Sequence, residues 1–129
     1  MRSNYRPESG ARLVVLDRDG VINRESAEFI KSADEWLPLP GSLEAIAALS
    51  RAGFAVVVAT NQSGVGRGLI SSLALEEIHS RMVQGVEQAG GKLAGIFYCP
   101  HRPEDDCSCR KPRPGLLQQI EARFGCSLK

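Results

Sequence analysis

The sequence predicts an α/β protein with a three-layer, doubly wound parallel sheet of the Rossmann-like type. Three short apolar runs alternate with three segments of helical periodicity, in the order β-α-β-α-β-α. The runs are almost uniformly apolar, which indicates strands that are covered on both faces rather than on one. The chain of 129 residues is long enough for one such domain with a single core.

The three strands are expected over residues 13–17, 55–61 and 95–100, which read LVVLD, AVVVATN and GIFYCP. Each run is bounded by residues with polar or metal-binding side chains. In open parallel sheets the ligand site lies beyond the carboxyl ends of the strands. We therefore expect the three loops that follow these strands to converge on one rim of the sheet.

The three helices are expected over residues 41–53, 73–91 and 113–125, where apolar residues recur at spacings of three or four. The expected caps, stops and first-turn residues are Ser42, Gly53, Gly90, Gly91, Pro114 and Gly125. His79 lies within the second of these helices and is expected on its surface, because nothing in the sequence pairs it with a nucleophile.

Composition excludes several classes of partner. Sixteen basic residues nearly balance fifteen acidic ones, so no global field favours nucleic acid or an anionic membrane. The sequence has neither a signal-peptide pattern nor an apolar run of membrane-spanning length. We expect a cytoplasmic protein whose residues 1–11 form a loose leader to a domain over 12–129, and its oligomeric state stays open.

Two carboxylates, Asp17 and Asp19, come directly after the first strand and are followed by Gly20. If the strand continued, their side chains would point the same way and repel each other. A turn or a helix cap is the structural alternative, but the position at the end of a buried strand favours chemistry. One carboxylate can attack phosphorus to form an aspartyl-phosphate while the other acts first as acid and then as base, with Mg²⁺ offsetting the negative charge.

The loop after the second strand reads ATNQSGVGRG, residues 59–68. Thr60, Asn61 and Ser63 provide hydrogen-bonding groups, and the glycines allow close backbone approach, which is typical of a phosphate cradle. The spacing is neither that of a Walker loop nor G-x-G-x-x-G. A flexible glycine turn explains this loop equally well.

The loop after the third strand contains three of the four cysteines within residues 99–109. Cys99, His101, Cys107 and Cys109 supply four soft ligands, the number and chemistry of a structural tetrahedral Zn²⁺ site. Arg110 and Lys111 follow the last ligand directly, so the zinc loop would fix their backbone. A cation held there can stabilise phosphoryl oxygens, and arginine can bind a phosphate with two hydrogen bonds.

With these residues in view, the chain resembles the haloacid dehalogenase superfamily of phosphotransferases. LDRDGVIN resembles its first motif, ATNQSG its second and RKP its third, and the C-x-H…C-x-C loop resembles its zinc-bearing branch. That branch contains the D-glycero-D-manno-heptose 1,7-bisphosphate 7-phosphatases and the histidinol phosphatases. The resemblance implies a Mg²⁺-dependent phosphatase that removes the 7-phosphate of the heptose bisphosphate, a step towards lipopolysaccharide.

Other functions stay open beside this one. Histidinol phosphate is the alternative substrate, and a catalytically silent, zinc-stabilised phosphosugar-binding or interaction domain is the alternative from another class. A zinc-dependent nucleic-acid binder is disfavoured, because the net charge is near zero and no basic-aromatic face is evident.

The resemblance also implies roles for individual residues. Asp17 would be the nucleophile and a Mg²⁺ ligand, and Asp19 the proton donor with its backbone carbonyl on Mg²⁺. Thr60 and Lys111 would stabilise the phosphoryl group. The implied substrate-binding residues are Arg18, Glu25, Ser26, Ala27, Glu28, Asn61, Gln62, Ser63 and Arg110, of which the segment 25–28, ESAE, departs from the glycine- and aromatic-containing family pattern.

A fourth family motif is missing from the sequence. The resemblance implies a strand that lies beside the first one and ends in an acidic residue completing the Mg²⁺ site, but the sequence stops after the last expected helix. We therefore expect a chain that lacks the C-terminal strands of a longer enzyme, leaves its first strand as an apolar edge, and is a poor phosphatase or inactive in this form.

Overall fold

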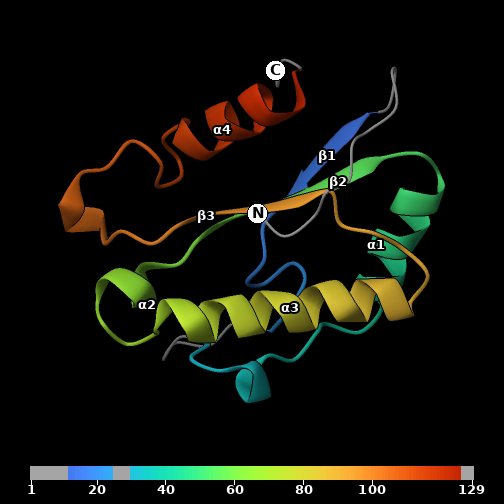
Figure 1. The fold of residues 1–129 in the computed structure, drawn as a ribbon, viewed down its shortest axis with the longest axis horizontal. Helices are drawn as coiled ribbons and strands as arrows, with labels where there is room; N and C mark the ends of the chain where they lie inside the picture. The colour runs from blue at the N-terminus through green and yellow to red at the C-terminus, as the bar shows by residue number, and fades with distance from the viewer. Residues whose placement is uncertain (1–11, 25–29, 126–129) are drawn as a thin grey trace.

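The computed structural model describes residues 12–24 and 30–125, and within them the chain forms a parallel sheet with strand order β1-β2-β3 (Figure 1). The strands are β1 (Leu13–Leu16), β2 (Ala55–Asn61) and β3 (Gly95–Cys99). The register runs from Leu13 opposite Ala55 in the first pair, and from Val57 opposite Gly95 in the second. The predicted parallel sheet is confirmed, with β1 and β3 each ending one residue earlier than expected.

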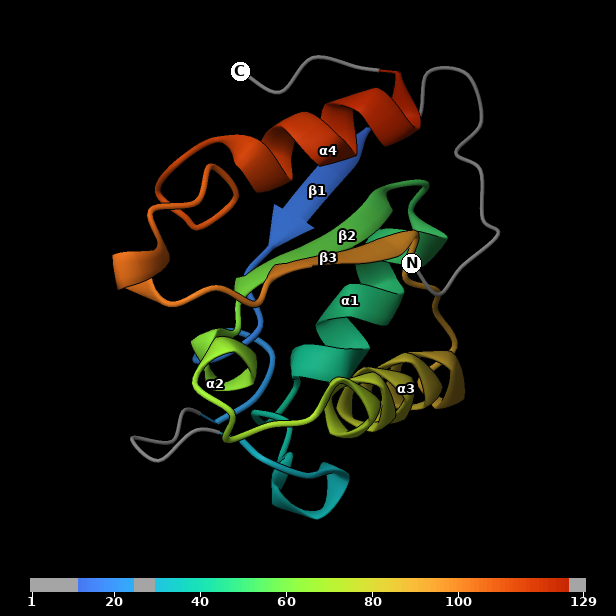
Figure 2. The same ribbon diagram turned by 60° about the vertical axis from the view of Figure 1, so that its left-hand side comes forward.

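Helices cover both faces of this sheet, as Figure 2 shows. α1 (Ser42–Arg51) and α3 (Ser72–Gln88) lie on one face, and α4 (Gly115–Phe124) lies on the other. Strands added in sequential order by right-handed crossovers place their connecting helices on the same side, which explains the position of α1 and α3. The predicted three-layer architecture is confirmed.

Short elements that the sequence analysis did not predict occur in the loops. They are α2 (Ser63–Gly66) and the 3-10 turns Ala33–Glu35 and Pro103–Asp105. Patterns this short carry no periodicity of their own, so hydrogen bonds within the loops decide them.

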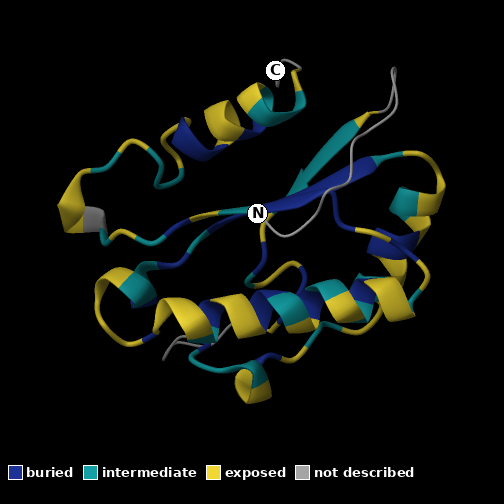
Figure 3. Ribbon diagram, viewed as in Figure 1, coloured by how far each residue is buried: buried dark blue, intermediate teal, exposed yellow. Residues whose placement is uncertain are grey.

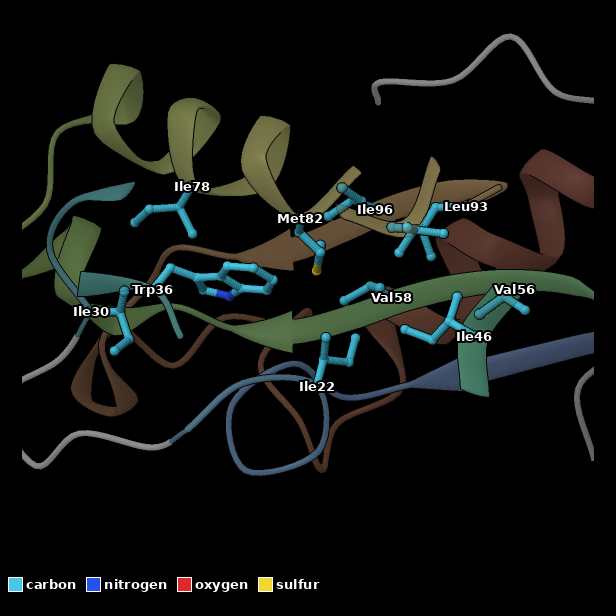
Figure 4. Close-up of a cluster of buried hydrophobic side chains, with 11 residues drawn as sticks. Ile22, Ile30, Trp36, Ile46, Val56, Val58, Ile78, Met82, Leu93 and Ile96 are labelled. Atoms are coloured by element: carbon cyan, nitrogen blue, oxygen red, sulfur yellow. The ribbon is translucent and has the colours of Figure 1, made fainter. Parts of the chain in front are cut away.

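The core is built around β2, whose residues 55–60 are all buried (Figure 3). Side chains alternate along a strand, so Val56 and Val58 pack towards α1 and α3, whereas Val57 packs towards α4. Trp36 is 1% exposed and lies in the cluster on the α1 and α3 face, where it extends towards Met82 (Figure 4). Burying each valine side chain of β2 contributes about 1.5–3 kcal/mol, so the central strand is firmly held and anchors the rim that follows it.

β1 differs from the expectation that all strands are buried. All four of its residues are only partly buried, because β1 lies at the edge of the sheet formed by the described residues and has one neighbour. The edge position itself was expected for a chain without the fourth motif. An apolar edge strand is a site that proteins normally cover.

Helix ends differ from the sequence prediction at α1 and at α4, where Pro114 is the N-cap rather than part of the first turn. Gly41, with φ of 79°, takes the N-cap position that was predicted for Ser42. The Ser42 hydroxyl instead donates at 2.7 Å to the Ile22 carbonyl, which also accepts the Leu39 N–H at 2.8 Å. The α3 cap is Ser71, whose Oγ accepts from the Ala74 N–H at 3.0 Å.

Some predictions fall outside the described residues. The expected leader (residues 1–11) and the substrate segment containing Glu25, Ser26, Ala27 and Glu28 belong to the part that is not described. The domain boundary at residue 12 and these substrate contacts stay predictions. Among the described residues, no helix has the length and apolar character to cross a membrane.

Candidate active site and metal centre

The loops after the three strands meet at one rim, as predicted. In Figure 1 the segments that follow β2 and β3 leave the same end of the sheet. Lys111 Nζ, from the third loop, lies 3.3 Å from Asp17 Oδ1 in the first. Gln62, from the second loop, donates through Nε2 to Asp19 Oδ2 at 2.8 Å and through its backbone N–H to the Cys99 carbonyl at 2.7 Å.

The first loop turns sharply rather than continuing the strand. The Arg18 carbonyl accepts the backbone N–H groups of Val21, Ile22 and Asn23 at 2.8–3.2 Å. Ile22 is 1% exposed and anchors this turn in the core. The turn directs the two carboxylates to different partners, so the repulsion expected along a continuing strand is avoided.

Asp17 is the more accessible carboxylate, with 45% of its side chain exposed. Its Oδ1 accepts the Arg18 backbone N–H at 2.7 Å and faces the Lys111 ammonium. The same ammonium donates to the Ala59 carbonyl at 2.7 Å, which keeps it at the end of β2. An accessible carboxylate beside a held cation is the arrangement that nucleophilic attack on phosphorus requires.

Asp19 is held by four hydrogen bonds. Its Oδ1 accepts from Arg18 Nε at 3.2 Å, Arg18 Nη2 at 2.9 Å and Asn23 Nδ2 at 2.9 Å, and its Oδ2 accepts from Gln62 Nε2. Burial by itself would raise the pKa of this carboxyl. The charge of Arg18 and the hydrogen bonds outweigh burial and lower the pKa below its usual value. Asp19 is therefore ionised at neutral pH in the free site.

Arg18 is fully buried, at 0% exposure, and its guanidinium contacts Asp19, Gln62 and His79. These contacts give Arg18 a part in holding Asp19, and its substrate contact stays a prediction. The prediction that His79 lies on a helix surface is wrong, since it is 3% exposed. The signal was in the spacing: His79 continues the apolar stripe of α3 between Leu75 and Met82, both of which are buried.

The polar residues after β2 connect parts of the rim. Thr60 is 1% exposed, and its Oγ1 accepts from Gln62 Nε2 at 3.0 Å. The Asn61 side chain hydrogen-bonds the backbone of Lys111. Ser63 is partly buried and begins α2. The predicted contacts of Asn61, Gln62 and Ser63 with substrate stay predictions.

One glycine of this loop has a clear structural use. The Gly66 N–H donates to the Pro100 carbonyl at 2.8 Å, and a Cβ on Gly66 would lie 2.6 Å from that oxygen. A residue with a side chain would have to push the third loop away. Gly66 therefore lets the second loop pack directly against the segment that contains Cys99 and His101.

The structure brings the four predicted zinc ligands together. Sγ of Cys99, Cys107 and Cys109 and one ring nitrogen of His101 all lie within 4.8 Å of one another. The Nδ1 atom of His101 is 3.5 Å from Cys99 Sγ and 3.3 Å from Cys109 Sγ. Cys99 is buried at the end of β3, which ties this cluster to the sheet.

The thiols have unequal acidities. For Cys107, burial would raise the pKa, but hydrogen bonds from Cys99, Cys109 and the Arg110 backbone lower the pKa to about 6. For Cys109, burial and the neighbouring thiols raise the pKa to about 12. One thiol thus ionises readily and its neighbour retains a proton. Three sulfurs and one imidazole are a ligand set that fits Zn²⁺, and the Cys107 sulfur is the one that ionises most readily. Zn²⁺ would displace the protons of the other thiols on binding.

A shallow hollow of about 190 Å³ lies beside the end of this loop. It is lined by Asp106, Cys107, Arg110, Lys111, Pro112 and Arg113. Arg110 is partly buried, and its Nη1 approaches the His101 carbonyl at 3.5 Å. The cations that follow the cysteine cluster, Arg110 and Lys111, therefore border this hollow.

Comparison with known proteins places these features in a family. Residues 12–128 match the family described as polynucleotide kinase 3 phosphatase. Two curated relatives named D-glycero-beta-D-manno-heptose-1,7-bisphosphate 7-phosphatase are 53% identical (Pseudomonas aeruginosa) and 51% identical (Neisseria meningitidis serogroup B). The matches cover 90% and 88% of this chain but 65% and 60% of those relatives, so the chain spans less than two thirds of their length.

Solved structures agree with this match. A D,D-heptose bisphosphate phosphatase from B. bronchiseptica, complexed with magnesium and phosphate, is 51% identical with a TM-score of 0.88. The match covers 91% of this chain and 65% of that one. A putative haloacid dehalogenase-like phosphatase from Mesorhizobium loti is 33% identical, with a TM-score of 0.78 over 88% of this chain and 57% of that one. The predicted resemblance is confirmed, and the chain belongs to the polynucleotide kinase 3 phosphatase family of haloacid dehalogenase-like proteins.

Proposed function

We propose that this chain carries the active site of a Mg²⁺-dependent phosphomonoester hydrolase that removes the 7-phosphate of D-glycero-D-manno-heptose 1,7-bisphosphate. The observation that supports this most is the exposed Asp17 carboxylate, 3.3 Å from the Lys111 ammonium, with the second carboxylate of Asp19 beside it in the same loop. The choice of substrate is supported by the names of relatives whose sequences are 53% and 51% identical to this chain.

In the first step, an Asp17 carboxylate oxygen attacks phosphorus, and the bond between phosphorus and the sugar oxygen breaks. The sugar oxygen leaves with its electron pair and takes a proton from Asp19. Lys111 and the Thr60 hydroxyl stabilise the phosphoryl oxygens. Asp19 is ionised in the free site, so it must gain its proton as the phosphate binds; the negative charge of the phosphate favours this by raising the pKa of Asp19.

In the second step, water attacks the phosphorus of the aspartyl-phosphate and gives its proton to the Asp19 carboxylate. The bond between phosphorus and Asp17 breaks, inorganic phosphate leaves, and the Asp17 carboxylate is restored. Asp19 is in the base form that this step needs, because it gave its proton to the sugar oxygen in the first step.

The residues fit both metals that the resemblance implies. Asp17 offers a largely accessible carboxylate, and Mg²⁺ is usually held by one or two carboxylates with water and substrate phosphate. When bound there, Mg²⁺ would offset the charge of the nucleophile and the phosphate. Zn²⁺ would take the ligands Cys99, His101, Cys107 and Cys109 and would fix the loop that precedes Arg110 and Lys111.

We also propose a cytoplasmic enzyme that acts on a small sugar bisphosphate and has no nucleic-acid or membrane partner. The three described cysteines are free thiols gathered in one cluster. Free thiols are typical of proteins in a reducing compartment, whereas disulfides are typical of an oxidising one. Arg110, beside the hollow at the end of this loop, would contact the part of the substrate away from the 7-phosphate.

Phosphate release tests this function. The chain would be assayed with the heptose bisphosphate and with histidinol phosphate, with and without Mg²⁺, beside the P. aeruginosa relative as a positive control. We expect Mg²⁺-dependent release of one phosphate per heptose bisphosphate, at a rate well below that of the relative, and none from the Asp17→Asn variant. Phosphate release from histidinol phosphate but not from the heptose bisphosphate would identify histidinol phosphate as the substrate. No release from the chain, and none from a chimera that joins it to the C-terminal part of the relative, would contradict the proposal if the relative itself is active.

A further inference from the structure

A buried histidine contacts the back of the candidate active site. His79 belongs to α3 and is 3% exposed, and its Nε2 lies 3.2 Å from Arg18 Nη1. Its ring also lies against Tyr98 of β3, with ring centroids 5.9 Å apart. Neither step of the proposed reaction uses this residue.

Hydrogen-bond chemistry decides how His79 meets Arg18. A guanidinium has five N–H donors and no acceptor. Nε2 of His79 must therefore be the acceptor, which places the ring proton on Nδ1 and leaves the imidazole neutral. Arg18 is 0% exposed, so its Nη1 group cannot exchange this partner for bulk water. A buried donor that loses its acceptor is costly, and more so when it carries charge.

The hydrogen bond from Arg18 to His79 helps to fix the orientation of the guanidinium group that also binds Asp19. Nε and Nη2 of Arg18 both donate to Asp19 Oδ1, and Nη2 also donates to Gln62 Oε1. Because the guanidinium is planar and rigid, fixing Nη1 also fixes the direction of the Nε and Nη2 edge. His79 thus reaches Asp19 through one intervening side chain.

We propose that His79 is a positioning residue for Asp19: its neutral imidazole holds Arg18 in the orientation that anchors Asp19 through Oδ1 and so keeps the carboxyl group in place for proton transfer. This inference rests on the proposed function, because it assigns Asp19 the proton that the leaving oxygen takes. Without the acceptor, the guanidinium can turn away from Asp19. The proton transfer then loses its fixed geometry, although the nucleophile Asp17 is untouched.

The hydrogen bond can be tested without any activity. ¹⁵N NMR of the chain near neutral pH reports which ring nitrogen of His79 carries the proton and resolves the Arg18 guanidinium. We expect a neutral ring with the proton on Nδ1, and an Arg18 signal that moves in His79→Phe and much less in His79→Gln, whose Oε1 can still accept. A proton on Nε2, or a doubly protonated ring, would overturn the proposal.

A comparison of leaving groups tests the link to Asp19. The heptose bisphosphate has an alkyl leaving group that needs a proton, whereas p-nitrophenyl phosphate releases a stable phenolate that needs little. General acid catalysis is typically worth about 10²- to 10⁴-fold, so we expect His79→Phe to lower kcat/KM for the sugar phosphate roughly 10-fold or more. The aryl substrate should lose much less, and His79→Gln should retain most activity on both.

Leu75→Val is the matched control for packing. Leu75 lies one helical turn from His79 on α3 and is equally buried, at 1% exposure, but has no polar group. This variant should lower stability and leave the ratio of the two kcat/KM values unchanged. Equal losses on both substrates in His79→Phe would reduce His79 to a structural role and overturn the proposal. If neither the unmodified chain nor its chimera with the C-terminal part of the relative turned over either substrate, the proposed function would fail, and the NMR result would still decide the His79 and Arg18 contact.

Discussion

The side-chain amide of Asn61 holds the backbone of Lys111 by two reciprocal hydrogen bonds. Asn61 Nδ2 donates to the Lys111 carbonyl at 3.1 Å, and the Lys111 N–H donates to Asn61 Oδ1 at 2.9 Å. The pair joins the end of β2 to the residue that follows the cysteine loop and its Arg110. Because the main chain is held at both polar groups, the Lys111 ammonium can rest between Asp17 and the Ala59 carbonyl.

Replacing Asn61 by alanine should therefore act through Lys111. Two hydrogen bonds contribute roughly 1–3 kcal/mol together, so Asn61→Ala should lower the free energy of unfolding by that order, as measured by urea denaturation. Activity should fall as well, but Asn61→Ala should add little to the loss in a Lys111→Ala background. Gln118→Ala, at an exposed position of α4, is the control and should change neither quantity. Fully additive losses would show that Asn61 acts independently of Lys111.

Substitutions of the two carboxylates, Asp17 and Asp19, should affect turnover differently. Asp17→Asn removes the nucleophile and should abolish turnover. Asp19→Asn should retain phosphoryl transfer from p-nitrophenyl phosphate but slow the sugar phosphate by about 10²- to 10⁴-fold, the usual worth of general acid catalysis. Quenched reactions analysed by mass spectrometry should find the phosphoryl group on Asp17. A phosphoryl group on any other residue would refute the assignment.

Loss of one sulfur ligand should lower zinc content and stability together. Cys107→Ser should bind less zinc per chain, measured by elemental analysis, and should unfold at a lower temperature, because metal binding to a closed ligand set stabilises the folded state. Ser108→Ala changes the exposed neighbour and should leave both unchanged. Since Arg110 and Lys111 follow this loop, activity should fall together with zinc; full activity in zinc-free protein would exclude a supporting role for the metal.

Two glycines of the second loop should respond differently to alanine. Gly66→Ala places a Cβ against the Pro100 carbonyl and should displace the segment that contains Cys99, lowering stability and zinc affinity together. Gly68 has φ of 76° and no atom within 4 Å of an added Cβ. Gly68→Ala should cost only the backbone strain of about 1–2 kcal/mol and leave zinc binding intact. Equal zinc affinity in the two variants, measured by competition with a chelator, would contradict this packing role of Gly66.

The sequence was sufficient where local patterns carry the information. Uniform apolar runs placed the strands, and apolar spacing of three or four placed the long helices, because periodicity reports which faces are buried. The order of these elements fixed a parallel sheet and hence one rim for all three loops. The spacing of Cys99, His101, Cys107 and Cys109 then identified four residues that the structure brings within 4.8 Å.

Only the tertiary structure decided which polar groups face each other. Arg18 and His79 are 61 positions apart and meet because the fold brings the first loop against α3, and no local pattern encodes that contact. The same holds for Asn61 and Lys111, 50 positions apart. Ser42 is an example at shorter range. Serine is a good helix cap, but the Ser42 hydroxyl donates to the Ile22 carbonyl, 20 positions away, instead of capping α1. Local propensity is worth about 1 kcal/mol at a cap, and an unsatisfied buried polar group costs as much or more, so long-range partners decide these side chains.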